Sequence, residues 1–201
     1  MKSIDDKENQ DIKLIERTVG GDEVAFEQLV QKYQHSVLNT IYRYIGDSAD
    51  AEDIAQEVFV KVWQHAKSFK GQSEFSTWLY RIVVNQCLNF RAKRKKKTIS
   101  LDELTESGNL PNSLKVGIEY PVPTGSLSGE DRKRASIVRK AVDELPKRQR
   151  IALVLSKFEG KSYKEIAQIM RTSLSSVESL IFRAKENLGG KLLPLREKGE
   201  I

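Results

Sequence analysis

The sequence predicts an all-α protein of two small helical domains joined by a flexible linker. Apolar residues recur at helical spacing over residues 11–97 and again over 131–190, and no stretch of the 201 residues keeps the alternation of a strand. Residues 98–130 hold three of the five prolines, four glycines and many serines and threonines, which is typical of a linker. We therefore expect domains at 11–97 and 131–190, with 98–130 between them.

The N-terminal domain is expected to contain three main helices. Asp22 can cap the first of them, Asp47 or Ser48 can cap the second after a break at Gly46, and the third begins near Phe75 after a loop at residues 70–73. The apolar stripes expected to form the core are Phe26, Leu29, Val30, Tyr33, Val37, Ile41 and Tyr44, then Ile54, Ala55, Val58, Phe59, Val62 and Trp63, then Phe75, Trp78, Leu79, Ile82, Val83, Cys87 and Phe90.

The C-terminal domain is expected to begin with a helix over 131–144, followed by one from Pro146 to Phe158 that ends at Gly160. The S-x-x-E capping pattern then occurs twice, at residues 162–165 and 175–178, on either side of a short polar turn. The second of these helices would bury Val177, Leu180, Ile181, Ala184 and Leu188. Two short helices and a tight turn predict a helix-turn-helix, although spacing alone leaves an ordinary helical hairpin open.

Charge patterning favours a polyanionic partner. Residues 65–97 hold nine Lys and Arg against one acidic residue, and residues 131–191 hold fifteen against seven, with an acidic linker between them. The outward side of the last predicted helix carries small and cationic residues suited to a DNA groove: Ser176, Ser179, Arg183 and Lys185. The cations that precede it and can hold phosphates are Lys147, Arg148, Arg150, Lys161, Lys164 and Arg171.

Several function classes are disfavoured. No apolar run approaches the ~20 residues of a membrane span, the N-terminus lacks the apolar region of a secretory signal, and the single Cys87 fits a reducing compartment, so we expect a cytoplasmic protein. His35 and His65 have no partner at metal-ligand spacing, and no phosphate-binding loop of the GxxxxGK[ST] type occurs. We expect no metal, no cofactor, no small-molecule substrate and no enzymatic activity.

One acidic ridge remains open to interpretation. Asp50, Asp53 and Glu57 lie at i, i+3 and i+7 beside Gln56, on one side of the second helix. Carboxylates along a regular helix do not converge on one point, so catalysis is disfavoured. By the residues alone, a solvated helix face is the plain interpretation of the pattern.

The two halves together resemble a known family. LPKRQRIALVLSKFEGKSYKEIAQIMRTSLSSVESLIFRAKENL is similar to region 4 of bacterial sigma factors, which reads the −35 promoter element. DAEDIAQEVFVKVWQ and FKGQSEFSTWLYRIVVNQCLNFRAKRKKK are similar to region 2. A short linker with no region 3 domain is the arrangement of the extracytoplasmic-function (ECF, group 4) sigma factors of the sigma-70 family.

This resemblance implies an RNA polymerase specificity subunit whose partners are core polymerase (β′ clamp helices and β flap), promoter DNA and an anti-sigma factor. The residues that would contact core polymerase are Asp50, Asp53, Gln56, Glu57 and Val60. Those that would capture and melt the −10 element are Lys67, Phe69, Lys70, Arg81, Asn85, Arg91, Lys93 and Arg94. The residues alone favour a place in the core for Phe69 and a plain surface position for Asn85, and Trp78 belongs to the apolar stripe.

The −35 element would be read by Lys161, Lys164, Arg171, Ser175, Ser176, Glu178, Ser179, Arg183 and Lys185. Many relatives carry cations where this recognition helix has Glu178 and Leu180, so the preferred −35 sequence stays open. Two rival functions also stay open: a dimeric helix-turn-helix repressor or activator that binds DNA without polymerase, and a recombinase-like enzyme. The first would need a dimerisation or effector domain, and the second a nucleophile or a converging carboxylate cluster.

Overall fold

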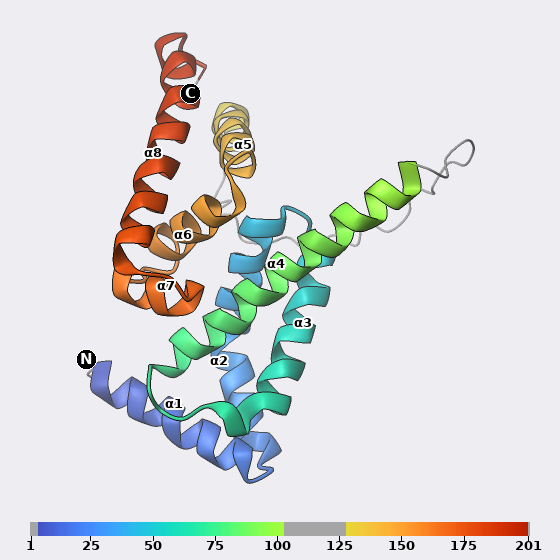
Figure 1. Cartoon of the computed structure of the whole chain (residues 1–201), viewed down its shortest axis with the longest axis vertical. Coiled ribbons are helices and arrows are strands. Elements are labelled where there is room, and N and C mark those ends of the chain that lie inside the picture. Colours follow the sequence, from blue (N-terminus) through green and yellow to red (C-terminus); the bar gives the residue numbers. More distant parts are fainter. Residues whose placement is uncertain (1–3, 103–127, 201) are drawn as a thin grey trace.

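The computed structural model describes residues 4–102 and 128–200, with side chains described for 10–90 and 128–200. The N-terminal lobe contains α1 (Ile4–Val19), α2 (Glu23–Ile45), α3 (Ser48–His65), the short 3₁₀ helix η1 (Ala66–Ser68) and α4 (Phe75–Asp102). The C-terminal lobe contains α5 (Gly129–Asp143), α6 (Lys147–Lys157), α7 (Tyr163–Met170) and α8 (Leu174–Glu197). The described residues contain no strand, which confirms the all-α prediction (Figure 1).

The helix boundaries of the N-terminal lobe follow local capping. The Asp22 carboxylate accepts a hydrogen bond from the backbone N–H of Ala25 at 3.0 Å and so starts α2. Gly46 ends α2 in the left-handed conformation, with φ at 93°, which a residue with a side chain rarely adopts. Asp47 rather than Ser48 then caps α3, because its carboxylate accepts from the N–H of Asp50. These helix starts confirm the predictions made from the sequence.

A buried polar cluster attaches α1 to α2. Asp11 is 5% exposed and accepts hydrogen bonds from the Lys32 ammonium and, at 2.6 Å, from the Tyr33 hydroxyl. Burial, followed by the hydrogen bond to the Asp11 carboxylate, raises the pKa of Tyr33 above its usual value. The cluster therefore keeps Tyr33 protonated and places its ring beside Phe75 at the start of α4, at a centroid distance of 5.4 Å.

The interlobe segment differs slightly from the prediction. Helix α4 continues through residues 98–102, which contain no glycine or proline, and so extends into the predicted linker. Helix α5 begins at Gly129 because the Ser128 hydroxyl accepts from the N–H of Asp131. The remaining predicted linker residues, 103–127, lie outside the described residues.

The helix-turn-helix has one cap as predicted and one shifted. At the start of α7, Ser162 and Glu165 form the full capping box. Arg171 then adopts a left-handed conformation (φ 49°) and turns the chain toward α8. The cap of α8 is Ser173 and not Ser175, because the Ser173 hydroxyl meets the N–H of Ser176 and starts the helix two residues earlier. The prediction of a second capping box ending at Glu178 was therefore wrong.

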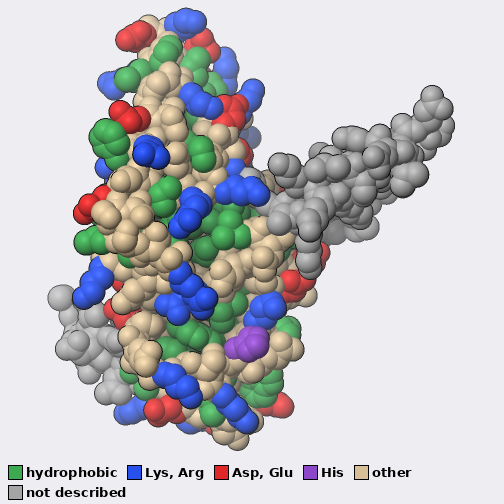
Figure 2. Space-filling model, viewed as in Figure 1, with side chains coloured by type: hydrophobic (Ala, Val, Ile, Leu, Met, Phe, Trp, Pro, Cys, Tyr) green, Lys and Arg blue, Asp and Glu red, His purple; other side chains and the backbone are tan. Residues whose placement is uncertain are grey.

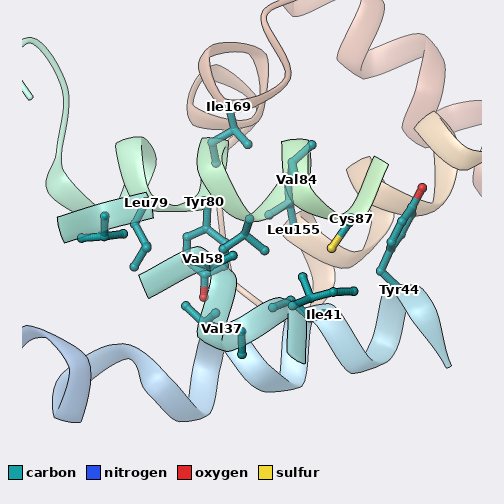
Figure 3. Packing of buried hydrophobic residues seen from close by; sticks show 14 of the residues in the cluster. Val37, Ile41, Tyr44, Val58, Leu79, Tyr80, Val84, Cys87, Leu155 and Ile169 are labelled. Carbon is teal, nitrogen blue, oxygen red and sulfur yellow. The ribbon is translucent and has the colours of Figure 1, made fainter. Parts of the chain in front are cut away.

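The two lobes share one apolar core. Residues from α2, α3 and α4 (Val37, Ile41, Tyr44, Val58, Leu79, Tyr80, Val84 and Cys87) form one cluster with Leu155 of α6 and Ile169 of α7 (Figure 3). Helix α7 lies against α4, and α6 lies against α2 (Figure 1). In this conformation the lobes are packed together, which their sequences do not predict. None of the described helices is both long and apolar enough to cross a bilayer.

Candidate nucleic-acid and protein interfaces

The start of α8 lines an open polar groove. Its walls are Arg148 from α6, Thr172 from the turn, and Ser175, Ser176, Ser179, Leu180 and Arg183 from α8. The four predicted −35 residues that it brings together are Ser175, Ser176, Ser179 and Arg183. Small hydroxyl side chains leave room for a base edge, and the cations at both sides suit phosphates.

The backbone at the start of α8 adds to this polarity. The hydroxyl of Ser173 caps the helix, and the Ser179 hydroxyl donates back to the carbonyl of Ser175 at 2.9 Å. The free N–H groups and the dipole at a helix N-terminus favour negative charge. Sequence reasoning included Arg148 only among general phosphate-binding cations and did not include Thr172. Arg148 and Thr172 reach the groove because of the way in which α6 and α8 pack, which the sequence does not show.

The other predicted −35 residues do not line this groove. Lys164, Arg171, Glu178 and Lys185 are exposed elsewhere on α7, the turn and α8. The side chain of Lys161 is only 12% exposed, and its ammonium donates to Ser76 of α4 at 2.7 Å and to Glu165 at 2.9 Å. Lys161 thus lies at the contact with the other lobe.

The prediction that Arg150 holds phosphates was wrong. Arg150 is 1% exposed, and its guanidinium donates to the Tyr44 carbonyl at 3.0 Å and to the Asp143 carboxylate at 2.7 Å. A second guanidinium nitrogen donates to the Asp143 carbonyl at 2.5 Å. The residue is buried because α6 is covered on all sides over the seven consecutive residues 149–155. Arg150 is therefore a structural residue.

The capping carboxylate of the helix-turn-helix is ionised over a wide pH range. Burial raises the pKa of Glu165, but the hydrogen bonds from Ser162 and from the Lys161 ammonium outweigh it and hold that pKa below its usual value. The Glu165 carboxylate accepts from both the N–H and the hydroxyl of Ser162, at 2.8 and 2.6 Å. This network fixes the start of α7 and, through the short turn, the orientation of α8.

The acidic ridge of α3 lies on the surface. Asp53, Gln56, Glu57 and Val60 are exposed and line a shallow polar groove with Lys61 and Gln64, whereas Asp50 is half-buried near the start of the helix. Glu57 accepts a hydrogen bond from Gln86 of α4 at 2.8 Å, which holds its carboxylate in place. Four of the five predicted polymerase-contacting residues, all except Asp50, thus line one groove on the surface of α3.

An apolar groove adjoins this face, and sequence reasoning missed it. Phe26, Val30 and Leu38 of α2 and Phe59, Val60 and Trp63 of α3 contribute its apolar walls. Trp63 is 38% exposed and packs edge-on against Phe26, with ring centroids 5.1 Å apart. Both residues were predicted as core because they belong to helical stripes. Those stripes are wider than the contact between α2 and α3, so their edges stay open.

The predicted −10 residues lie in three different environments. Asn85 on α4 and the cations Lys67 and Lys70 beside the loop are exposed. Phe69 is half-buried and packs edge-on against Phe75 and Trp78 at 5.9 and 5.7 Å, so its ring belongs to an aromatic cluster in this conformation. Arg81 donates to the Gln168 carbonyl of α7 at 3.1 Å. The side chains of Arg91, Lys93 and Arg94 lie outside those described.

Basic side chains extend over both lobes. Figure 2 shows Lys and Arg side chains along one face of the molecule from α8 to α1, with hydrophobic side chains between them. Within the described residues, no group of three or more His, Cys, Asp or Glu side chains has the proximity of a metal site. The surface features of the described chain are therefore a basic face, a polar groove on α8, and an acidic face with an apolar groove on α2 and α3.

Comparison with known proteins matches both halves of the chain. Residues 29–97 match the family model described as Sigma-70 region 2, and residues 135–188 match the one described as Sigma-70, region 4. The chain is 36% identical over 188 residues to the RNA polymerase sigma-H factor of Pseudomonas aeruginosa, covering 94% of this chain and 96% of that protein. It is 38% identical over 185 residues to the ECF RNA polymerase sigma-E factor of Escherichia coli K12, covering 90% and 94%.

Solved structures support the fold. CnrH, solved in complex with the cytosolic domain of CnrY, superposes with a TM-score of 0.63 at 23% identity, covering 91% of this chain and 97% of that chain. The sigma factor RpoE from Bartonella quintana, solved with the anti-sigma factor NepR, also gives 0.63 at 23% identity, covering 83% and 96%. At this identity the similarity shows a shared arrangement of helices.

Proposed function

This chain belongs to the ECF sigma factors of the sigma-70 family, and we propose that it binds core RNA polymerase, directs it to promoters with −35 and −10 elements, and helps to open them. The observation that carries this function is the near full-length match to RNA polymerase sigma factors, which includes both regions in order. A helix-turn-helix repressor acting without polymerase would account for the C-terminal lobe alone.

We assign core-polymerase binding to α3. Its exposed residues Asp53, Gln56, Glu57 and Val60 combine a polar ridge with an apolar edge, and the adjoining groove adds Trp63. An interface that pairs apolar anchors with a polar rim has the composition of protein–protein contacts. Asp50, half-buried at the start of α3, would contribute from the margin. The β′ clamp helices are the proposed partner of this face, and the β flap that of the C-terminal lobe.

We assign −10 capture to η1, the following loop and α4. Asn85 is exposed and offers both a donor and an acceptor to the edge of a flipped base. Lys67 and Lys70 would hold the displaced strand, and Arg91, Lys93 and Arg94 would continue this contact along α4. Phe69 would have to leave its aromatic cluster to stack on a base, so its contribution depends on a rearrangement of the loop.

We assign −35 reading to the groove at the start of α8. Ser175, Ser176 and Ser179 would approach base edges in the major groove, while Arg148 and Arg183 would hold phosphates on its two sides. Glu178 can accept a hydrogen bond from a cytosine amino group if its side of α8 enters the groove. Lys164, Arg171 and Lys185 would add phosphate contacts, so affinity should decrease steeply with salt.

Promoter opening by this chain needs no catalytic group. Capture of a flipped base stabilises the open duplex and shifts the opening equilibrium by that binding free energy. We therefore propose a non-enzymatic regulator that uses no cofactor and acts in the cytoplasm together with RNA polymerase. An anti-sigma factor is its proposed regulator, since the solved structures with this fold include complexes with such proteins.

Co-elution with core polymerase tests the assignment of α3. Wild-type chain should co-elute on gel filtration, and Val60→Glu should reduce the fraction bound at least 10-fold because it places a charge at the apolar edge of the face. Val138→Glu is the matched control, since Val138 is also exposed, on α5. If the wild-type chain co-elutes and the two variants lose binding equally, or neither loses it, the assignment to α3 is refuted. Absence of any wild-type complex would refute the proposed function itself.

A further inference from the structure

Three side chains join α1 to α2 in a buried polar cluster, and none of them is among the residues proposed to contact DNA or polymerase. Asp11 of α1 accepts hydrogen bonds from the Lys32 ammonium and, at 2.6 Å, from the Tyr33 hydroxyl, both of α2. The same ammonium lies 5.4 Å from the centre of the Tyr33 ring. Each member of this Asp11 cluster therefore contacts the other two, and the Tyr33 ring is fixed in orientation as well as in place.

The Asp11 cluster is better suited to orientation than to stability. The Asp11 side chain is buried, and taking a carboxylate out of water costs free energy that its ion pair only partly offsets. Apolar residues of similar volume often attach two helices equally well or better. A hydrogen bond is directional, so it fixes where a ring points, which apolar packing alone does not.

The Tyr33 ring supports the aromatic rings on which the −10 loop, residues 69–74, is built. Its centroid is 5.4 Å from that of Phe75, which is 2% exposed. Phe75 in turn packs against Phe69 at 5.9 Å and against Trp78 at 5.8 Å. Phe75 thus connects the position of Tyr33 to that of Phe69.

Both ends of the −10 loop rest on these rings. Phe69 follows η1 directly and Phe75 is the first residue of α4, so their contact closes the loop between them. Gly71 within the loop has φ at 66°, which allows the chain to turn back. Helix α1 also lies against η1, whose Ala66 is 2% exposed (Figure 1). The loop is therefore supported at its start by α1 and at its end by α2.

The residues assigned to −10 capture depend on the position of this loop. Lys67 and Phe69 lead into it, Lys70 lies in it, and Asn85 follows ten residues after Phe75 on α4, about 15 Å further along the helix. Groups that bind a ligand precisely need neighbours that hold them to within roughly 0.5 Å. The rings below the loop are the neighbours that can do this.

We propose that Asp11 is a positioning residue for −10 capture: through Tyr33 and Phe75 it sets the place of the loop that receives the displaced strand. The inference rests on the proposed function and adds to it a contribution from α1. Because Asp11 is buried, its effect passes through the rings and not through contact with DNA.

The first experiment measures binding of single-stranded DNA by the complex of the chain with core polymerase. The probe is a short fluorescent strand that carries the −10 block enriched by the wild-type complex from randomised promoter DNA. Tyr33→Phe keeps the ring and Asp11→Asn keeps the volume, and each should weaken strand binding about 5- to 10-fold, the factor for loss of one hydrogen bond. Affinity for core polymerase should stay within about 2-fold, because α3 is a separate site. The double variant should bind no more than about 2-fold more weakly than the weaker single variant, because both changes remove the same interaction.

Ile15→Val is the matched control for simple destabilisation. Ile15 is 1% exposed and lies one turn further along α1, so losing a methyl group loosens that helix while the Asp11 cluster keeps its hydrogen bonds. It should lower thermal stability and leave strand binding within about 2-fold. An equal loss of strand binding in Ile15→Val, or unchanged binding in Tyr33→Phe or Asp11→Asn, would overturn the positioning role and leave the proposed function intact. Absence of strand binding by the wild-type complex would instead refute the proposed −10 capture.

Trp78 reports on the rings directly. The chain has two tryptophans, so Trp63→Phe leaves Trp78, whose ring lies 5.7 Å from that of Phe69, as the single fluorescent indole of the free chain. In this background Tyr33→Phe should raise acrylamide quenching of Trp78 by about 1.5-fold or more, because loosened rings admit the quencher more often. Ile15→Val should not. Quenching that Tyr33→Phe leaves unchanged would show that the rings do not depend on the Asp11 cluster, and would overturn the proposal.

Discussion

Replacement of Arg150 by methionine tests the structural account at a position where sequence and structure disagree. Methionine fills a similar volume, so the change removes the guanidinium and little packing. The Tyr44 carbonyl would lose its Arg150 donor in a buried location, at a cost of about 1–3 kcal/mol, and the hydrogen bond to the Asp143 carbonyl about 1 kcal/mol more. The Asp143 carboxylate side chain is 36% exposed and rehydrates, so its ion pair adds little.

The expected loss for Arg150→Met is therefore about 3 kcal/mol, which corresponds to roughly 6–12 °C in Tm for a protein of this size. Urea unfolding followed by circular dichroism measures it. Arg148→Met is the matched control two residues away, and because Arg148 is exposed it should change stability by less than about 0.5 kcal/mol. The two variants should rank in the opposite order for DNA binding. Arg148→Met should weaken DNA binding more than Arg150→Met does, because Arg148 lines the groove of α8. Equal stability of the two variants would refute the buried structural role of Arg150.

Three further predictions concern α7, α4 and α3. Hydrogen bonding holds the pKa of Glu165 below its usual 4.5, so the contribution of its carboxylate to folding stability is present above pH 4.5 and is lost as the pH falls through the folded pKa. Glu165→Gln should therefore be less stable than wild type by up to about 1 kcal/mol at pH 7. This difference should vanish at acid pH when unfolding is measured as a function of pH. Asn85→Ala should reduce promoter opening about 10-fold, measured by permanganate reactivity, while core binding stays unchanged. Gln10→Ala is the control, because it removes an exposed amide of α1. A loss of core binding in Asn85→Ala would contradict the assignment. Trp63→Ala should weaken core binding by about 2 kcal/mol in a titration, with thermal unfolding changed far less because Trp63 is 38% exposed; unaltered affinity would exclude the apolar groove from the interface.

The sequence predicted those features that depend on neighbours along the chain. Caps such as Asp22 and Ser162 are decided within about four residues, so their positions follow from residue type and spacing. Where two hydroxyls compete, as Ser173 and Ser175 do, the pattern does not show which one meets a free N–H first. The recognition of α7 and α8 as a helix-turn-helix was robust to that shift, because the buried stripe of Val177, Ile181 and Ala184 is unchanged.

The features that the sequence did not predict depend on how helices pack. Arg150 is buried because α6 lies on α2, and the pattern of α6 alone does not reveal this contact. Trp63 lines an open groove because the apolar stripes are wider than the contact between α2 and α3, although its spacing is that of a core residue. The contact between the lobes joins residues about 80 to 120 apart in sequence, such as Tyr80 and Thr40 with Glu159, and no local signal encodes such a pairing.

The central claim is that this chain gives core RNA polymerase the ability to select a promoter. Transcription in vitro from a library of randomised promoters, with the transcribed templates sequenced, tests it whatever the preferred promoter sequence is. With the chain present, the account predicts enrichment of two sequence blocks near −35 and −10 at a fixed separation, with ribonucleotide substrates as the only energy source. Templates that are no more enriched than with core polymerase alone would contradict the claim.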